Sequence, residues 1–252
     1  MSTLRARCPE CRTLTAVALD DGYECHRCGR SFAAGLVRVH SAWGGGGEAM
    51  REGAMLPLPW PEAATVEAAT LEEQTAAVAA ALPVRPLVLG GCCCAHLGAI
   101  RGLAARHRRP AVVWLDAHGD LNTPETSPTG NPWGMPLRMA IDEGAVAPQR
   151  VAHVGARDLD PAELEYMRRV GIDADVARAV EGSDAVYVAL DADVVRPGEL
   201  VPFMPVAGGP ALAEVVELLR TLPRVDGLGL TGHVRDLRNV EPLTDLARAA
   251  GL

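Results

Sequence analysis

Short apolar runs alternate with longer stretches of helical periodicity along most of the chain, from residue 36 to the C-terminus. Most of the short runs are continuously apolar, which is typical of strands that helices cover on both faces. The longer stretches are rich in Ala and Leu and predict helices. We predict strands at residues 36–40, 86–89, 111–115, 150–154, 185–190 and 227–230, and helices at residues 70–81, 95–107, 161–170, 210–222 and 241–249.

The alternation of strands and helices predicts an α/β fold with three layers, α/β/α, around a mainly parallel sheet. We place this domain at residues 35–252. Four consecutive glycines at 44–47 interrupt its start as a flexible loop. They lack the spacing and the following Lys of a phosphate-binding loop, so we assign them no chemistry.

Composition narrows the class of protein. A chain of 252 residues with 48% hydrophobic content can bury a full α/β core and still carry a small appendage. The net charge of -8 argues against a surface that coats nucleic acid, because such surfaces need clustered Lys and Arg. The sequence contains neither a run of about 18 apolar residues nor a secretory signal, so we expect a cytoplasmic protein that does not bind membranes.

Seven cysteines fall into two groups, and the first group predicts a metal site. Two CxxC pairs, thirteen residues apart, can form two tight turns that surround one tetrahedral ion with four sulfurs. A segment with so little core needs the metal to fold. We therefore interpret residues 1–34 as a ribbon with a structural zinc; a redox or disulfide pair is the alternative, and the partner of the ribbon stays open. The four cysteines are Cys8, Cys11, Cys25 and Cys28.

Acidic residues follow two of the predicted strands. Asp116, His118 and Asp120 come directly after residues 111–115, and Asp191 and Asp193 come at the end of residues 185–190. Ligands of parallel sheets bind at the carboxyl ends of strands, and side chains two residues apart point to the same side. We therefore expect four carboxylates and an imidazole in one crevice, held together by one or two manganese or zinc ions. The alternative is that each Asp caps a helix or forms a turn.

These motifs resemble those of the ureohydrolase family of arginases, agmatinases and formiminoglutamases, whose members carry DAHxD and DxD around a two-manganese site. Residues 116–135, which read DAHGDLNTPETSPTGNPWGM, are similar to the metal and substrate loop of arginases. Residues 154–172, VGARDLDPAELEYMRRVGI, resemble the strand and helix that border the substrate. The resemblance covers about 165 residues, from Leu89 to the C-terminus, and implies an arginase-like fold.

The resemblance also implies residue roles. Asp116, Asp120 and Asp191 would hold a first metal, and Asp116, His118, Asp191 and Asp193 a second. A metal-bound hydroxide would then attack a guanidinium or amidinium carbon, since divalent cations lower the pKa of bound water. The positions at which arginases hold the α-carboxylate and α-ammonium of their amino acid are Asn122, Ser127, Thr129, Asn131 and Asp160, with a turn or capping role open for each.

Three residues depart from the family pattern. Cys93 stands where arginases have a metal-binding His, which favours zinc or iron over manganese, because thiolate is a soft ligand. It is alternatively a buried thiol in a site with one ion, and His96 is a weaker candidate ligand that we expect to face elsewhere. Trp133 replaces the proton-shuttle His, and we predict that it binds the substrate instead. Gly232 replaces the Glu that pairs with the guanidinium, and the adjacent His233 is either an acid or ligand in that gap or an ordinary loop histidine.

From these observations we predict a metal-dependent hydrolase of C–N bonds in a guanidino, amidino or related amide substrate, and not a standard arginase. We predict that His118, Asp120 and His233 are the catalytic residues. The alternative is a catalytically inactive binding or regulatory protein with the arginase fold. We expect a small-molecule substrate with an amino-acid part, a homo-oligomer and no nucleic-acid partner.

Overall fold

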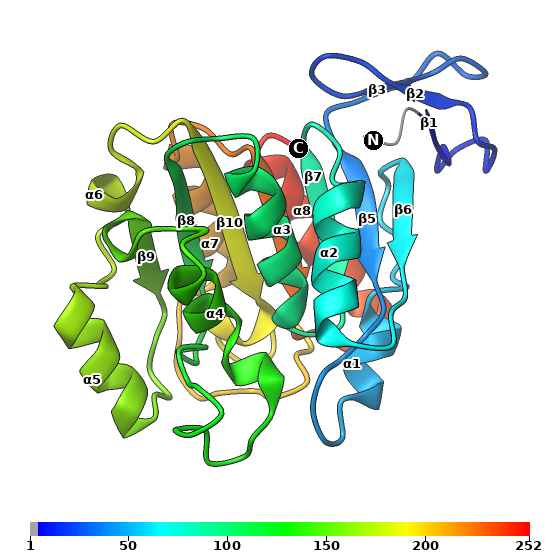
Figure 1. Cartoon of the computed structure of the whole chain (residues 1–252). Helices are drawn as coiled ribbons and strands as arrows, with labels where there is room; N and C mark the ends of the chain where they lie inside the picture. The colour runs from blue at the N-terminus through cyan, green and yellow to red at the C-terminus, as the bar shows by residue number, and fades with distance from the viewer. Residues whose placement is uncertain (1–4) are drawn as a thin grey trace.

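The computed structural model describes residues 5–252, and within them it shows two separate β-sheets (Figure 1). The larger sheet begins at Gly35, close to the predicted boundary between ribbon and main domain. The smaller sheet is antiparallel and contains β1 (Arg5–Ala6), β2 (Ala16–Ala18), β3 (Tyr23–Cys25) and β4 (Ser31–Phe32).

In the described chain the larger sheet has seven strands in the order β6-β5-β7-β11-β10-β8-β9, and all neighbours are parallel. The strands are β5 (Gly35–Val39), β6 (Glu62–Val66), β7 (Pro86–Gly90), β8 (Pro110–Leu115), β9 (Val151–Val154), β10 (Ala185–Asp191) and β11 (Gly227–Thr231). All six predicted strands are present to within one residue at either end. The sequence does not predict β6, because its Glu-Ala-Ala-Thr-Val run has few residues that favour strands.

Helices cover both faces of this sheet, which confirms the predicted three-layer α/β/α fold (Figure 1). The helices are α1 (Glu48–Gly53), α2 (Leu71–Ala81), α3 (Cys94–Ala104), α4 (Pro136–Asp142), α5 (Pro161–Val170), α6 (Val176–Val180), α7 (Leu212–Thr221) and α8 (Val240–Ala249). The five predicted helices are present, and the described residues contain three further short helices, α1, α4 and α6. No helix within residues 5–252 has the length and apolar character needed to cross a membrane.

Two hydrophobic cores lie on the two faces of the sheet, because successive side chains of a strand point to opposite sides. In β7, Leu87 and Leu89 belong to the core with α7 and α8, and Val88 belongs to the core with α2 and α3. All three side chains are fully buried. A strand buried on both faces must therefore be apolar at every position, which is why the continuous runs in the sequence locate the sheet.

Helix α5 shows how local sequence positions the loop of the site. Asp160 occupies its N-cap position and donates its backbone N–H to the Glu163 carboxylate at 2.9 Å, and Pro161 occupies the first turn. The helix ends at Gly171, whose φ of 78° is a left-handed conformation that glycine adopts without steric cost. The carboxylate of Glu163 also accepts a hydrogen bond from the backbone N–H of Leu121, at 3.0 Å, and so ties the helix to the loop after β8.

The small sheet docks on the edge strand of the large one. Arg7 and Glu62 exchange two backbone hydrogen bonds of 2.8 and 2.9 Å, and Ala63 of β6 packs into the apolar cluster of the small sheet. The Glu62 carboxylate accepts a hydrogen bond from Arg38 of β5 at 2.7 Å. In Figure 1 the small sheet lies at the upper end of the molecule, whereas α1 lies at the lower end.

Candidate metal centre

A cavity of about 290 Å³ opens at the carboxyl ends of β8, β10 and β11. Its lining comes from the main domain and begins at Met50, so none of its residues belongs to the small sheet. The cavity lining contains six of the metal-ligand candidates that the sequence places in the main domain: Cys93, Asp116, His118, Asp120, Asp191 and Asp193.

The loop after β8 supplies three of these side chains. Asp116 is buried, and its two carboxylate oxygens accept hydrogen bonds from the Trp114 indole at 3.2 Å and from the backbone N–H of His118 at 2.8 Å. Asp120 adopts a left-handed conformation, with φ of 54°, that few residues other than glycine adopt. One of its carboxylate oxygens is buried and has no hydrogen-bond partner among the described residues. An orphaned buried carboxylate oxygen of this kind fits a ligand to a cation.

The end of β10 supplies the two other acids and joins them to the first loop. The backbone N–H of Asp193 donates to the Asp191 carboxylate at 3.0 Å, and that of Ala117 donates to the Asp193 carboxylate at 3.1 Å. The Nδ1 atom of His118 lies 2.9 Å from the other carboxylate oxygen of Asp193. The two motifs, far apart in the sequence, therefore form one continuous group of polar side chains.

Two sets of potential ligands share one residue. In each set the ligand atoms lie within 4.8 Å of one another, and the sets are Cys93, Asp116 and Asp120, and Asp116, His118 and Asp193. Asp191 adjoins the first set, since the Cys93 thiol donates to its carboxylate at 2.9 Å. Asp116 is common to both sets, so its carboxylate is placed to bridge two ions. The donor set of four carboxylates, one imidazole and one thiol fits one or two divalent cations.

The electrostatics of the metal-free site also favours a cation. Burial, together with the neighbouring Asp193, raises the pKa of Asp191 to about 7. Burial and the charge of Asp116 raise the pKa of Asp193 to about 6. Burial lowers the pKa of His118, but its contacts with Asp116 and Asp193 outweigh that effect and raise it to about 12. Carboxylates so closely packed hold protons unless a positive charge lies between them.

The loop between β8 and α4 forms a polar wall of the same cavity. The Ser127 hydroxyl accepts a hydrogen bond from the Gly130 N–H at 3.0 Å, and the Thr129 hydroxyl accepts one from the Asn131 N–H at 3.2 Å. The two hydroxyl oxygens lie 3.5 Å apart and one can donate to the other, so at least one hydroxyl proton can point away from the loop. The cavity lining includes every predicted substrate-binding position: Asn122, Ser127, Thr129, Asn131, Trp133 and Asp160.

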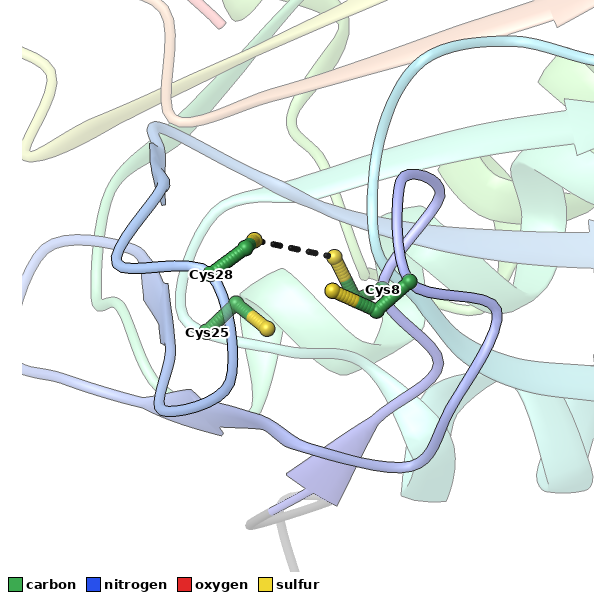
Figure 2. Close-up of side chains that lie close together, drawn as sticks. Cys8, Cys25 and Cys28 are labelled. Carbon is green, nitrogen blue, oxygen red and sulfur yellow. Dashed lines mark hydrogen bonds between the residues drawn. The ribbon is translucent and has the colours of Figure 1, made fainter.

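A second group of ligands lies in the small sheet (Figure 2). Figure 2 shows Cys25 and Cys28 on one turn facing Cys8 on the other, and the Cys8 and Cys28 sulfurs are 3.9 Å apart. The four ribbon sulfurs, including that of Cys11, lie within 4.8 Å of one another. A zinc ion with four Zn–S bonds of about 2.3 Å requires sulfurs about 3.8 Å apart, so this cluster fits a tetrahedral ion.

The sequence model of the arginase family matches residues 49–250, most of the chain. The chain belongs to the arginase family. It is 34% identical to the arginase of Bacillus caldovelox over 154 residues, which covers 49% of this chain and 52% of that arginase. The arginase of Brevibacillus brevis is 36% identical over 154 residues, with the same coverage. The chain thus spans about half the length of the curated relatives it matches.

Solved structures of the family share the fold. The arginase of Bacillus subtilis superposes with a TM-score of 0.73 at 21% identity, covering 86% of this chain and 97% of that one. The proclavaminate amidino hydrolase of Streptomyces clavuligerus gives a TM-score of 0.67 at 21% identity, with 86% and 89% coverage. Identities this low establish the arginase fold alone.

All three departures from the arginase pattern lie in the cavity: Cys93, described above, Trp133 and Gly232. Trp133 lines the cavity at the position of the predicted proton-shuttle His, and an indole cannot exchange a proton. Gly232 follows β11 with φ of 69°, and a Cβ atom added there would lie 2.0 Å from an Asp191 carboxylate oxygen. The position that the resemblance assigns to a guanidinium-binding Glu therefore has no room for a side chain.

Two histidines that the sequence analysis considered as candidates, His96 and His233, lie outside the cavity lining. The ring of His233 is buried, and its nitrogens lie 3.1 Å from the Gly53 carbonyl and 3.3 Å from the Thr231 carbonyl. This placement corrects the prediction that His233 acts as acid or ligand in the cavity: backbone contacts turn its ring away. His96, expected to face elsewhere, lies behind Cys93, with hydrogen-bond contacts of 3.0 Å to Tyr187 and Thr231.

Several residues that support the centre were not predicted from the sequence. The Arg157 guanidinium donates to the backbone carbonyl of Asp193 at 2.6 Å and to those of Val194 and Val206 at 3.2 Å, so it fixes the segment after β10. Glu163 is a buried acid in the cavity wall. An Asp-capped helix with Glu at its third position was the available signal for Glu163, whereas an isolated Arg gives none.

Proposed function

We propose that this chain is a metal-dependent hydrolase of C–N bonds in a guanidino, amidino or related amide substrate. The observation that supports the proposal is the convergence of two ligand sets on a shared Asp116 at the base of one cavity. A divalent ion bound there would act as a Lewis acid and lower the pKa of water to a range where it attacks carbon near neutral pH. Structural carboxylates rarely crowd a cavity without a partner, so a purely structural cluster accounts less well for the orphaned oxygen of Asp120.

We assign metal-binding and substrate-binding roles to the residues of the cavity. Cys93, Asp116, Asp120 and Asp191 would hold one ion, and Asp116, His118, Asp191 and Asp193 a second. Ser127 and Thr129, at least one of which can donate its hydroxyl proton outward, suit a carboxylate at the polar wall, and Asp160, fixed by a 2.8 Å hydrogen bond from Asn122, suits an ammonium group. The loop thus supports the predicted amino-acid part of the substrate.

The ion at the Cys93 position is proposed to be zinc. Thiolate is softer than imidazole, and soft ligands favour zinc over manganese. Replacing the bound ion by cobalt tests this, because a thiolate ligand adds a charge-transfer band in the near ultraviolet. The band should persist in Cys92→Ser and disappear in Cys93→Ser. The ribbon keeps its zinc, which gives no such band, and only the ion of the cavity is exchanged for cobalt, since ribbon thiolates bound to cobalt would give the same signal.

Activity is tested on metal-reconstituted protein with a panel of guanidino, amidino, ureido and amide compounds, by release of urea, ammonia or amine. We expect turnover with zinc or manganese and loss of at least about 10² in rate in Asp191→Asn, because a ligand to the ion is removed. Asp245→Asn, on the exposed face of α8, is the matched control. Absence of turnover across the panel with both metals would refute the hydrolase.

A binding or regulatory protein is the second candidate, and Trp133 and Gly232 favour it, since both replace groups that act directly on a guanidinium. The Asp191→Asn variant separates the two. A hydrolase loses turnover and keeps its fold and ligand affinity largely intact, whereas a binding protein with a structural metal loses stability with no turnover to lose. Thermal melting and turnover are measured on the same samples.

The four cysteines of the small sheet are proposed to hold a structural zinc. Their spacing, the mutual approach of their sulfurs and the shortage of apolar core in the ribbon support this. The Thr15 hydroxyl lies 3.2 Å from the Cys25 sulfur, and this hydrogen bond lowers the pKa of Cys25 to about 6, which favours the thiolate that zinc requires. Metal analysis should give one zinc fewer in Cys25→Ser than in the unmodified chain.

A further inference from the structure

Part of the cavity lining is apolar. Trp133 and Phe203 meet edge to face, with ring centroids 6.3 Å apart and planes at 71°. Met50 and Met204 line the cavity with them, and Met50 is buried in the same apolar cluster as both rings. These four side chains, called here the aromatic wall, adjoin the metal ligands and offer no charged or hydrogen-bonding group except the indole N–H of Trp133.

The run of four glycines gives this wall its shape. A Cβ atom added to Gly44 would lie 2.2 Å from the six-membered ring of Trp133, and one added to Gly47 would lie 3.0 Å from it. The N–H of Gly45 donates to the Asn131 side chain at 2.9 Å, which joins the glycine loop to the segment that carries Trp133. The indole therefore rests on bare backbone, and a side chain at position 44 would displace it.

Phe203 occupies the neighbourhood of the missing Glu. Its backbone N–H donates to the Gly232 carbonyl at 2.7 Å, and Pro202 pairs with His233. The acid closest to Gly232 is the metal-ligand candidate Asp191. The remaining carboxylates of the lining, Asp158, Asp160 and Glu163, come from the segment after β9 and the start of α5. Next to Gly232 the cavity thus presents an aromatic ring and no free carboxylate.

We infer that the centre hydrolyses an uncharged amide or ureide whose apolar, ring-sized substituent packs on the aromatic wall. The inference rests on the proposed hydrolase function and specifies its substrate. A planar cation is recognised by paired hydrogen bonds to a carboxylate, and burying it beside an apolar wall without that carboxylate is unfavourable. An uncharged amide avoids this penalty, and its substituent gains from leaving water. Water is the only co-reactant: the C–N bond breaks, the carbon gains the hydroxyl of water, and the nitrogen takes the remaining proton and leaves as ammonia or an amine.

The first test measures binding, so it does not depend on turnover. Zinc-loaded full-length protein is titrated by calorimetry with acetohydroxamic acid and with 3-phenylpropionohydroxamic acid, which share a metal-binding group and differ in the apolar part. We expect the phenyl compound to bind at least about tenfold more tightly. Equal affinities would overturn the inference and leave the hydrolase intact, whereas failure of acetohydroxamic acid to bind would count against the metal centre itself.

Matched glycine variants locate the effect. Gly44→Ala should remove most of the gain from the phenyl group, because its methyl displaces the Trp133 ring, and acetohydroxamic acid should bind as before. Gly45→Ala is the control, since a Cβ there meets only one atom, at 4.0 Å, and the N–H remains. Trp133→His should match Gly44→Ala. Circular dichroism and melting confirm that each variant is folded. A phenyl gain that survives in both Gly44→Ala and Trp133→His would refute the role of the wall.

The second test addresses the charge of the reacting group. The ratio of kcat/KM is measured for 3-phenylpropionamide and 2-phenylethylguanidine, which carry similar substituents. We expect the amide to be preferred by at least about tenfold. Preference for the guanidine would show that the cation stacks on the indole instead, and it would overturn the inference while confirming a hydrolase.

Discussion

Substitution of Gly232 offers a quantitative test of the close contact between its backbone and the Asp191 carboxylate. An Ala at this position adopts φ near 69°, which costs about 1–2 kcal/mol for a residue with a Cβ atom. Its methyl also meets both oxygens of the Asp191 carboxylate, at 2.0 and 2.1 Å, so the carboxylate must move. Overpacking of this kind costs about 1–3 kcal/mol. The sum is about 2–5 kcal/mol, and the displaced Asp191 should also weaken metal binding.

Gly144→Ala is the matched control that measures only the cost of a positive φ for a residue with a Cβ atom. Gly144 has φ of 73°, and a Cβ atom there has no neighbour within 4 Å among the described residues. Each kcal/mol lowers the melting temperature of a chain of this size by about 2–4 °C. Differential scanning calorimetry with and without zinc should therefore give a larger shift for Gly232→Ala than for Gly144→Ala, and a smaller stabilisation by zinc. Equal shifts and equal zinc effects in the two variants would refute the close approach to Asp191.

Three further predictions concern other parts of the molecule. Burial lowers the pKa of His96 to about 3, below the value near 6.5 of the unfolded chain, so stability is complete above pH 6.5 and falls as the pH drops toward 3. We expect His96→Gln to reduce the slope of the free energy of unfolding against pH, measured by urea titration between pH 6.5 and 4.5, by up to about 1.4 kcal/mol per pH unit. An unchanged slope would contradict a neutral buried imidazole. Arg157→Lys cannot reproduce the fork of backbone hydrogen bonds and should weaken zinc binding by about tenfold in competition with a chelator, with Arg196→Lys as an exposed control; equal affinities would exclude a positioning role. Removal of the ribbon zinc with a chelator should increase hydrogen exchange in β1 to β4 before β8 and β10, and simultaneous exchange would contradict a separately stabilised ribbon.

The central strands and the acidic motifs could be predicted because the signals are local. Strands β8 and β10 are continuously apolar and end directly at Asp116 and Asp191, so sequence position alone determines which end of the sheet carries the ligands. Strand β6 could not be predicted in this way. Its Glu62 serves the contacts with Arg7 and Arg38, both distant in sequence, and these tertiary contacts override weak strand propensity.

The orientation of the His233 ring, after β11, also depends on contacts with residues distant in the sequence. The ring of His233 meets the carbonyl of Gly53, which is 180 residues away in the sequence. The close approach of Gly232 to Asp191 arises between neighbouring strands, β11 and β10, whose order in the sheet cannot be read from the chain. The same holds for Gly44 and Gly47, whose partner Trp133 lies on a loop beyond β8. Patterns in sequence locate elements, whereas the partners of single residues follow from topology.

The bridge between Arg7 and Glu62 has a consequence for self-association. An uncovered edge strand is a template on which another chain can add a strand, and such edges promote aggregation unless they are blocked. At β6 the ribbon backbone already takes up part of the available hydrogen bonds, and Ala63 is covered by the ribbon cluster. Loss of the ribbon ion would therefore expose the hydrogen-bonding groups of β6 at the edge of the large sheet. The bound metal would then affect the solubility of the protein as well as the folding of the ribbon.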